Sequence, residues 1–145
     1  MFNDLKIENL LLCTFVLMNS TLPKIEKLKS AKLIEYLFTS GKRLKKYPVQ
    51  LLFVAVDKEL QNPIQVAFSV PKRNIKNAVD RNRIKRQLRE AYRINKHLFT
   101  TSNTHIAVMF IYMGKEETSF NNIVEAIEKL AAKFQQIQHT DENKS

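Results

Sequence analysis

The sequence predicts an α+β fold, in which one β-sheet is backed by helices as a two-layer α/β sandwich. Three segments repeat apolar residues at helical spacing: residues 31–38, 78–95 and 121–137. Three others are nearly continuous apolar runs: residues 49–56, 64–70 and 105–112. This order of helices and strands is typical of a helix-backed sheet. With 145 residues, the chain has the size of one domain with a single modest core.

The first helix is expected over residues 31–38, because its apolar residues share one face: Leu33, Ile34, Leu37 and Phe38. Gly41 is placed to end this helix. Pro48 precedes the first strand, and residues 57–63 between the first two apolar runs are typical of a hairpin connection.

The third strand, residues 105–112, is closed by Gly114. The last helix is the most regular, with apolar residues at Ile123, Val124, Ile127, Leu130, Ala131 and Phe134. Residues 139–145 form a polar tail.

The middle helix carries most of the charge. Between Lys72 and Lys96, ten lysines and arginines stand against Asp80 and Glu90, so this segment holds +8 of the formal net charge of +10. One face is an apolar stripe: Ile84, Leu88, Ala91 and Tyr92. The other face is basic or polar: Asn82, Lys85, Arg86, Arg89 and Arg93. Only Glu90 can offset its neighbours at four-residue spacing, with Arg86 on one side.

Such an unbalanced run is best explained by an anionic ligand, because arginine forks match phosphate groups. Residues 24–46 are also basic, and the rest of the chain is net acidic. The positive charge is therefore concentrated as a binding face requires, which indicates a nucleic-acid-binding protein.

The same residues carry a family resemblance. Phe68-Ser69-Val70-Pro71-Lys72-Arg73, then Ala78-Val79, Arg81-Asn82-Arg83, Lys85-Arg86, Arg89-Glu90 and Arg93 resemble the signature of the protein subunit of bacterial ribonuclease P. The resemblance extends in order from residue 27 to residue 134. It implies a ribosomal-protein-S5-domain-2-like fold: a four-stranded sheet with three helices, a short extra strand at residues 42–46, and a left-handed crossover through the basic helix. Pattern alone favours the right-handed connection, which holds in about 98% of parallel crossovers.

The resemblance also implies a function. In this family an RNA cleaves the 5′ leader from precursor tRNA, and the protein helps bind the substrate and productive Mg²⁺, which RNA phosphates mainly hold. The expected partners are thus the catalytic RNA and precursor tRNA. The expected RNA-binding residues are Lys72, Arg73, Lys76, Arg81, Asn82, Arg83, Lys85, Arg86, Arg89 and Arg93. The positions expected to line a cleft for the leader are Ile34, Phe38 and Phe53, and packing in the core is the alternative for both phenylalanines.

No catalytic or metal site of the protein itself is predicted. The histidines are far apart and lack metal-ligand spacing with the lone Cys13, and two glycines do not make a phosphate loop. Three alternatives remain: a ribosomal-protein-like module that stabilises rRNA, a DNA-binding regulator, and a protein-only enzyme. The regulator is disfavoured because no short turn and partner helix precede the basic helix.

Residues 1–20 form an N-terminal extension of uncertain origin, with Met18 as an alternative start, and residues 21–138 form the domain. The apolar run at residues 10–18 is too short for a bilayer, which needs about 20 residues. Asp4, Lys6 and Glu8 do not fit the basic start of a signal peptide. With a single cysteine, we expect a cytoplasmic protein without a membrane partner.

Overall fold

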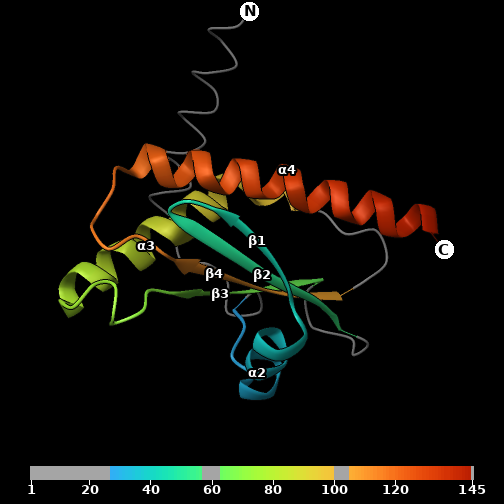
Figure 1. Ribbon diagram of the computed structural model, residues 1–145, viewed down its shortest axis with the longest axis horizontal. Helices are drawn as coiled ribbons and strands as arrows, with labels where there is room; N and C mark the ends of the chain where they lie inside the picture. The colour runs from blue at the N-terminus through green and yellow to red at the C-terminus, as the bar shows by residue number, and fades with distance from the viewer. Residues whose placement is uncertain (1–26, 57–62, 100–104, 145) are drawn as a thin grey trace, which may run out of the picture.

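The computed structural model describes residues 27–56, 63–99 and 105–144, and the expectations for residues 1–20 lie outside this part (Figure 1). The elements follow in the order α2 (Ala31–Ser40), β1 (Lys42–Lys46), β2 (Val49–Val56), β3 (Ile64–Ser69), α3 (Ala78–Asn95), a 3-10 turn η2 (Lys96–Leu98), β4 (His105–Tyr112) and α4 (Phe120–Lys144). The α+β class, the short strand β1 and the α3 helix are thereby confirmed.

The four strands form one mixed sheet in the order β1-β2-β4-β3. Strand β2 is antiparallel to both β1 and β4, whereas β3 is parallel to β4. The predicted hairpin between β2 and β3 is therefore wrong, because β4 lies between them. The close turn instead joins β1 to β2 and contains a cis peptide bond between Tyr47 and Pro48. Helix α3 is the crossover connection between the parallel neighbours β3 and β4.

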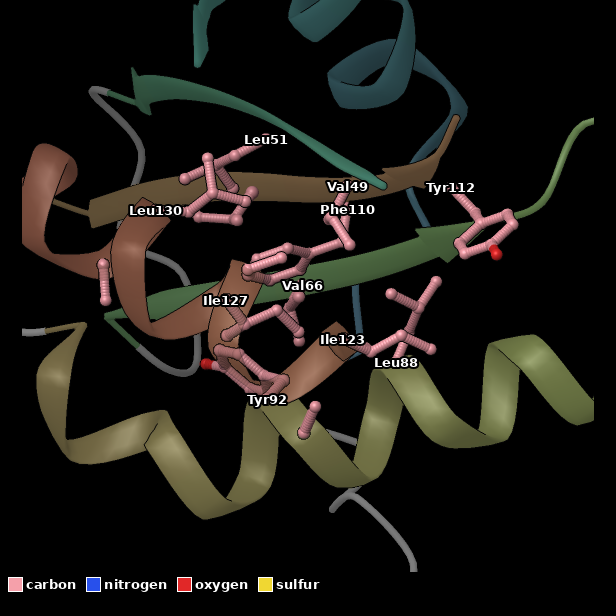
Figure 2. Packing of buried hydrophobic residues seen from close by; sticks show 14 of the residues in the cluster. Val49, Leu51, Val66, Leu88, Tyr92, Phe110, Tyr112, Ile123, Ile127 and Leu130 are labelled. Atoms are coloured by element: carbon pink, nitrogen blue, oxygen red, sulfur yellow. The ribbon is translucent and has the colours of Figure 1, made fainter. Parts of the chain in front are cut away.

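Helices cover both faces of the sheet (Figure 1). Helices α3 and α4 pack on one face, and the short α2 packs on the other. Figure 2 shows side chains of α3 and α4 reaching toward the strands, among them Leu88, Tyr92, Ile123 and Ile127. Four aromatic rings join the layers at the centre of this core: Tyr92, Phe99, Phe110 and Phe134.

Successive residues of β2 point to opposite faces of the sheet, as in any strand. Val49, Leu51 and Phe53 belong to the core under α3 and α4. Leu52 and the half-buried Val54 belong to the smaller cluster under α2.

Gly41 ends α2, as predicted, but not through a left-handed conformation. Its φ is −70°, and its N–H donates to the carbonyl of Leu37 at 3.0 Å. A Cβ atom at this position would lie 2.3 Å from the same carbonyl oxygen. Glycine is thus required here by the close approach of the chain to the last turn of the helix.

Helix α4 runs further than its apolar pattern predicts. Residues 139–144 of the predicted polar tail continue the helix, and Asp141 pairs with Lys42 of β1 at 2.8 Å. No helix among the described residues is long and apolar enough to span a bilayer.

Candidate nucleic-acid interface

Helix α3 docks one side on the sheet and turns the other outward. Asn77 caps its N-terminus, because the side-chain oxygen accepts a hydrogen bond from the Val79 N–H at 3.0 Å. The predicted apolar stripe is confirmed, since each of its members is at most 1% exposed: Ile84, Leu88, Ala91 and Tyr92. Burial of this stripe fixes the direction in which the basic residues point.

Most of the predicted RNA-binding residues lie at the surface. The exposed ones are Lys72, Arg73, Lys76, Asn82, Arg83 and Arg86. Lys85 and Arg89 are half-buried. Asn82, Lys85, Arg86 and Arg89 recur at three- and four-residue spacing, so they share one side of the helix. The loop before α3, residues 70–77, adds its lysines and arginine at the N-terminal end of this side.

Arg81 fixes that loop. Its Nη1 donates to the backbone carbonyls of Ile75 and Lys76 at 3.0 and 2.7 Å. The loop is also closed by hydrogen bonds from the backbone N–H groups of Asn74 and Ile75 to the Pro71 carbonyl. Arg81 thus positions the loop that carries Lys72, Arg73 and Lys76, in addition to its predicted role at the interface.

Arg83 is already paired with acids of the chain. Its Nη1 lies 3.1 and 3.2 Å from the two carboxylate oxygens of Glu117, in the loop between β4 and α4. Asp80, one turn earlier in α3, lies 3.7 Å from the same nitrogen. Glu117 was not predictable as a partner, because 34 residues separate it from Arg83 in the chain.

Arg93 differs from the other basic residues of the helix. Its side chain is only 11% exposed and pairs with Glu90 at 3.1 Å. The expectation that Glu90 offsets Arg86 was therefore wrong, because the carboxylate turns to the residue three positions later. Arg86 remains exposed.

The three positions predicted to line a leader cleft do not come together. Ile34 is half-buried in the cluster under α2, and Phe38 of the same helix is 46% exposed. Phe53 lies on the opposite face of the sheet, where it is 3% exposed and its ring centroid lies 5.0 Å from that of Phe134. Phe53 is a core residue, and its predicted place in the cleft is wrong.

Leu52 and Val54 occupy the α2 side of β2 instead. Beside them, Arg43 of β1 donates from Nη2 to the Phe38 carbonyl at 3.2 Å and brings a positive charge to the backbone of this residue. Sequence reasoning missed Leu52 and Val54. The alternation of side chains along β2 places them, once the face of one β2 residue is known.

A shallow pocket of about 220 Å³ lies at the other flank of α3. Arg89 and the segment before α2 supply its cations, and β3 supplies an apolar floor; the lining is Lys27, Leu28, Lys29, Val66, Ala67, Phe68 and Arg89. The segment is held against β3 by a hydrogen bond from the Leu28 N–H to the Val66 carbonyl at 2.9 Å. The basic surface therefore continues beyond α3 to the edge of the sheet.

At the opposite end of the basic surface, Tyr112 links the loop before α3 to the loop after β4. Asn74 donates from its side chain to the Tyr112 carbonyl at 3.3 Å, and the Tyr112 hydroxyl donates to the Glu116 carbonyl at 2.5 Å. Burial raises the pKa of Tyr112 above its ordinary value of 10.0, and the nearby Tyr47 and Glu117 raise it further. The neutral phenol can therefore donate its hydrogen bond throughout the physiological range of pH.

The described residues contain no group of three or more histidine, cysteine, aspartate or glutamate side chains that could hold a metal ion. The surface offers arginines, lysines and an exposed aromatic ring. These groups can bind and orient a polyanion.

An outward-facing basic helix on a helix-backed sheet, in a chain of net charge +10, defines a small nucleic-acid-binding protein. The Ribonuclease P family model matches residues 22–135. The chain therefore belongs to the ribonuclease P protein family.

Several relatives support this assignment. The ribonuclease P protein component of Chlorobium phaeobacteroides is 37% identical over 125 residues, which cover 77% of this chain and 86% of the relative. That of Porphyromonas gingivalis is 30% identical over 112 residues, which cover 74% and 82%.

Solved structures show the same fold. The RNase P protein of Staphylococcus aureus superposes with a TM-score of 0.61 at 19% identity, over 78% of this chain and 97% of that protein. The RNase P protein of Thermotoga maritima gives a TM-score of 0.60 at 22% identity, over 73% and 94%.

Proposed function

We propose that this chain is the protein component of ribonuclease P and acts in tRNA processing in the cytoplasm. In this ribonucleoprotein an RNA removes the 5′ leader of precursor tRNA by endonucleolytic cleavage. Family membership supports the assignment. The structural observation that carries it is the exposed basic side of α3 together with the loop at residues 70–77.

The basic side of α3 and the loop before it bind the catalytic RNA in this proposal. Arginine and lysine side chains at three- and four-residue spacing suit a series of phosphate groups. Arg81 contributes by holding the loop through the carbonyls of Ile75 and Lys76. Arg86 is exposed and lies on the side of α3 opposite the apolar stripe, so it is positioned to reach phosphate directly.

The leader binds at the α2 side of the sheet. Phe38 offers an exposed ring for stacking on an unpaired base, and Arg43 lies beside it for the adjacent phosphate. Ile34 contributes apolar surface only. Because only the precursor has an unpaired 5′ extension, this contact favours the precursor over the mature tRNA.

Mg²⁺ belongs to the RNA in this proposal. The described residues of the chain do not form a cluster of ligands that fits the ion, whereas RNA phosphates are the oxygen ligands that Mg²⁺ prefers. The protein contributes by holding the leader, which raises substrate affinity.

A cleavage assay with precursor tRNA tests the proposal. Rigorously RNA-free protein should leave the substrate intact. A bacterial ribonuclease P RNA should release the leader slowly at low magnesium, and the protein should accelerate it. Metal-dependent cleavage by the protein alone, lost when a carboxylate is replaced, would overturn the proposal. So would the absence of any effect of the folded protein on the RNA-catalysed reaction.

A further inference from the structure

One arginine of the proposed RNA-binding face is occupied by acids of the protein itself. Arg83 is 52% exposed at its side chain, so RNA can reach it. Yet Glu117 receives hydrogen bonds from its Nη1 at both carboxylate oxygens, and Asp80 adds a second negative charge at 3.7 Å. The local sum of these three formal charges is negative, next to the basic side of α3.

The loop that carries Glu117 is held in place by specific contacts. The Tyr112 hydroxyl binds the Glu116 carbonyl, next to Glu117 in the chain. A Cβ atom at Gly114 would lie 2.8 to 2.9 Å from atoms of the Tyr112 side chain, so the loop passes this ring at a distance that only glycine allows. At the far end of the loop, Ser119 accepts a hydrogen bond from the Asn122 N–H at the start of α4. Glu117 is thus held beside Arg83 from both ends of its loop.

We propose that Glu117 is an intramolecular competitor of RNA for Arg83. A phosphate group at Nη1 needs the same donors that Glu117 occupies, so this nitrogen cannot serve both. Arg83 then contacts RNA through Nη1 only where the RNA places a phosphate that displaces Glu117. Glu117 therefore determines specificity: it lowers affinity for polyanions in general and reserves Arg83 for a well-placed phosphate. This inference rests on the proposed RNA-binding function of α3.

Equilibrium binding of full-length Glu117→Gln to a bacterial ribonuclease P RNA tests the inference. The amide keeps the shape of the side chain but removes the charge that holds Arg83. Affinity should rise about two- to fivefold, the range that corresponds to the contribution of exposed ion pairs. The gain should shrink as salt is raised, because salt screens the pair that the substitution removes.

Two comparisons separate competition from a general charge effect. Glu116→Gln removes the same charge from the exposed neighbouring residue and should give a smaller gain. In an Arg83→Ala background, Glu117→Gln should give no gain beyond that of Glu116→Gln. Equal gains from the two glutamates, or a Glu117→Gln gain that still exceeds the Glu116→Gln gain in the Arg83→Ala background, would overturn the inference. Failure of the wild-type chain to bind the RNA at all would instead contradict the proposed function.

Discussion

At the scale of single residues, the proposed leader binding depends on Phe38. Phe38→Ala should weaken binding of leader-bearing tRNA by about 1–3 kcal/mol, the contribution of one base stacked on an aromatic ring, with little effect on leaderless tRNA. The protein should remain as stable as the wild type, because the ring is 46% exposed. Affinities for the two tRNAs, measured in the presence of the catalytic RNA, check this expectation.

Tyr36 provides a matched control on the same helix. It is also 46% exposed, but it lies two residues from Phe38 and so about 200° around the helix. Tyr36→Ala should leave both affinities unchanged. An equal loss from the two substitutions would indicate a general effect on α2 and would remove the stacking contact.

Phe53 should behave in the opposite way. It is 3% exposed and packs edge-on against Phe134, so Phe53→Leu should lower the free energy of unfolding by about 1 kcal/mol or more. Below the melting temperature, the preference for leader-bearing tRNA should be that of the wild type. Denaturant unfolding, together with the affinities for leader-bearing and leaderless tRNA, tests this expectation. A selective loss of leader binding in a stable Phe53→Leu protein would show that Phe53 contacts the leader.

The misplacement of Phe53 has a physical cause. In a strand with one wet face, alternation of polar and apolar residues reveals which side chains point inward. Strand β2 is covered on both faces, so it is apolar at nearly every position and alternation gives no such signal. The contact between Arg83 and Glu117 was equally unpredictable, because it joins helix α3 to the loop between β4 and α4 through the tertiary fold.

At the scale of elements, the arginines of α3 fall into two groups. Arg86 is exposed, so Arg86→Ala should weaken binding of the catalytic RNA without changing the melting temperature. The slope of log affinity against log salt should flatten by about 0.7–0.9, the value for one lost phosphate contact.

Arg81→Ala should weaken binding and also lower the melting temperature, because the carbonyls of Ile75 and Lys76 lose their donor.

Lys129 of α4 is the control for this comparison. It is exposed and paired with Glu125 at 2.8 Å. Lys129→Ala also removes one positive charge, but it should leave the affinity close to that of the wild type. If Lys129→Ala and Arg86→Ala reduce affinity equally, net charge and not the α3 surface governs binding.

The helices were more predictable than the order of the strands, again because of which sides of each element are buried. Helix α3 has one buried and one basic side, so its 3.6-residue period is visible in the sequence and its boundaries were correct. The strands were also located nearly to the residue. Their order was not predictable from short connections, because β4, which follows β3 through the long α3 crossover, inserts between β2 and β3.

At the scale of the whole molecule, stability should depend on the ionisation of Tyr112. The folded-state pKa of this phenol is raised above 10.0 by burial and by Tyr47 and Glu117. The stability that comes from the neutral phenol is therefore fully present below pH 10 and is lost as the pH rises through the folded-state pKa. The Tyr112→Phe protein has no ionisable group at this position.

Melting temperatures between about pH 9 and pH 11.5 test this linkage. The wild type should lose more stability across this range than Tyr112→Phe, although the variant starts lower because it lacks the hydrogen bond to the Glu116 carbonyl. Parallel decreases in the two proteins would show that Tyr112 ionises in the folded state as readily as in the unfolded state.

Three connections of the chain converge on the end of β4. The β1–β2 turn accepts a hydrogen bond at Pro48 from the Met113 N–H at 2.7 Å, the loop before α3 binds the Tyr112 carbonyl through Asn74, and the loop after β4 binds the Tyr112 hydroxyl. These hydrogen bonds hold the backbone that carries Lys72, Arg73 and Lys76 in place without RNA. In the proposed function, capture of the RNA therefore sacrifices little backbone entropy. The speed of encounter is set by long-range attraction between the basic surface and the RNA, so it should decrease as ionic strength rises.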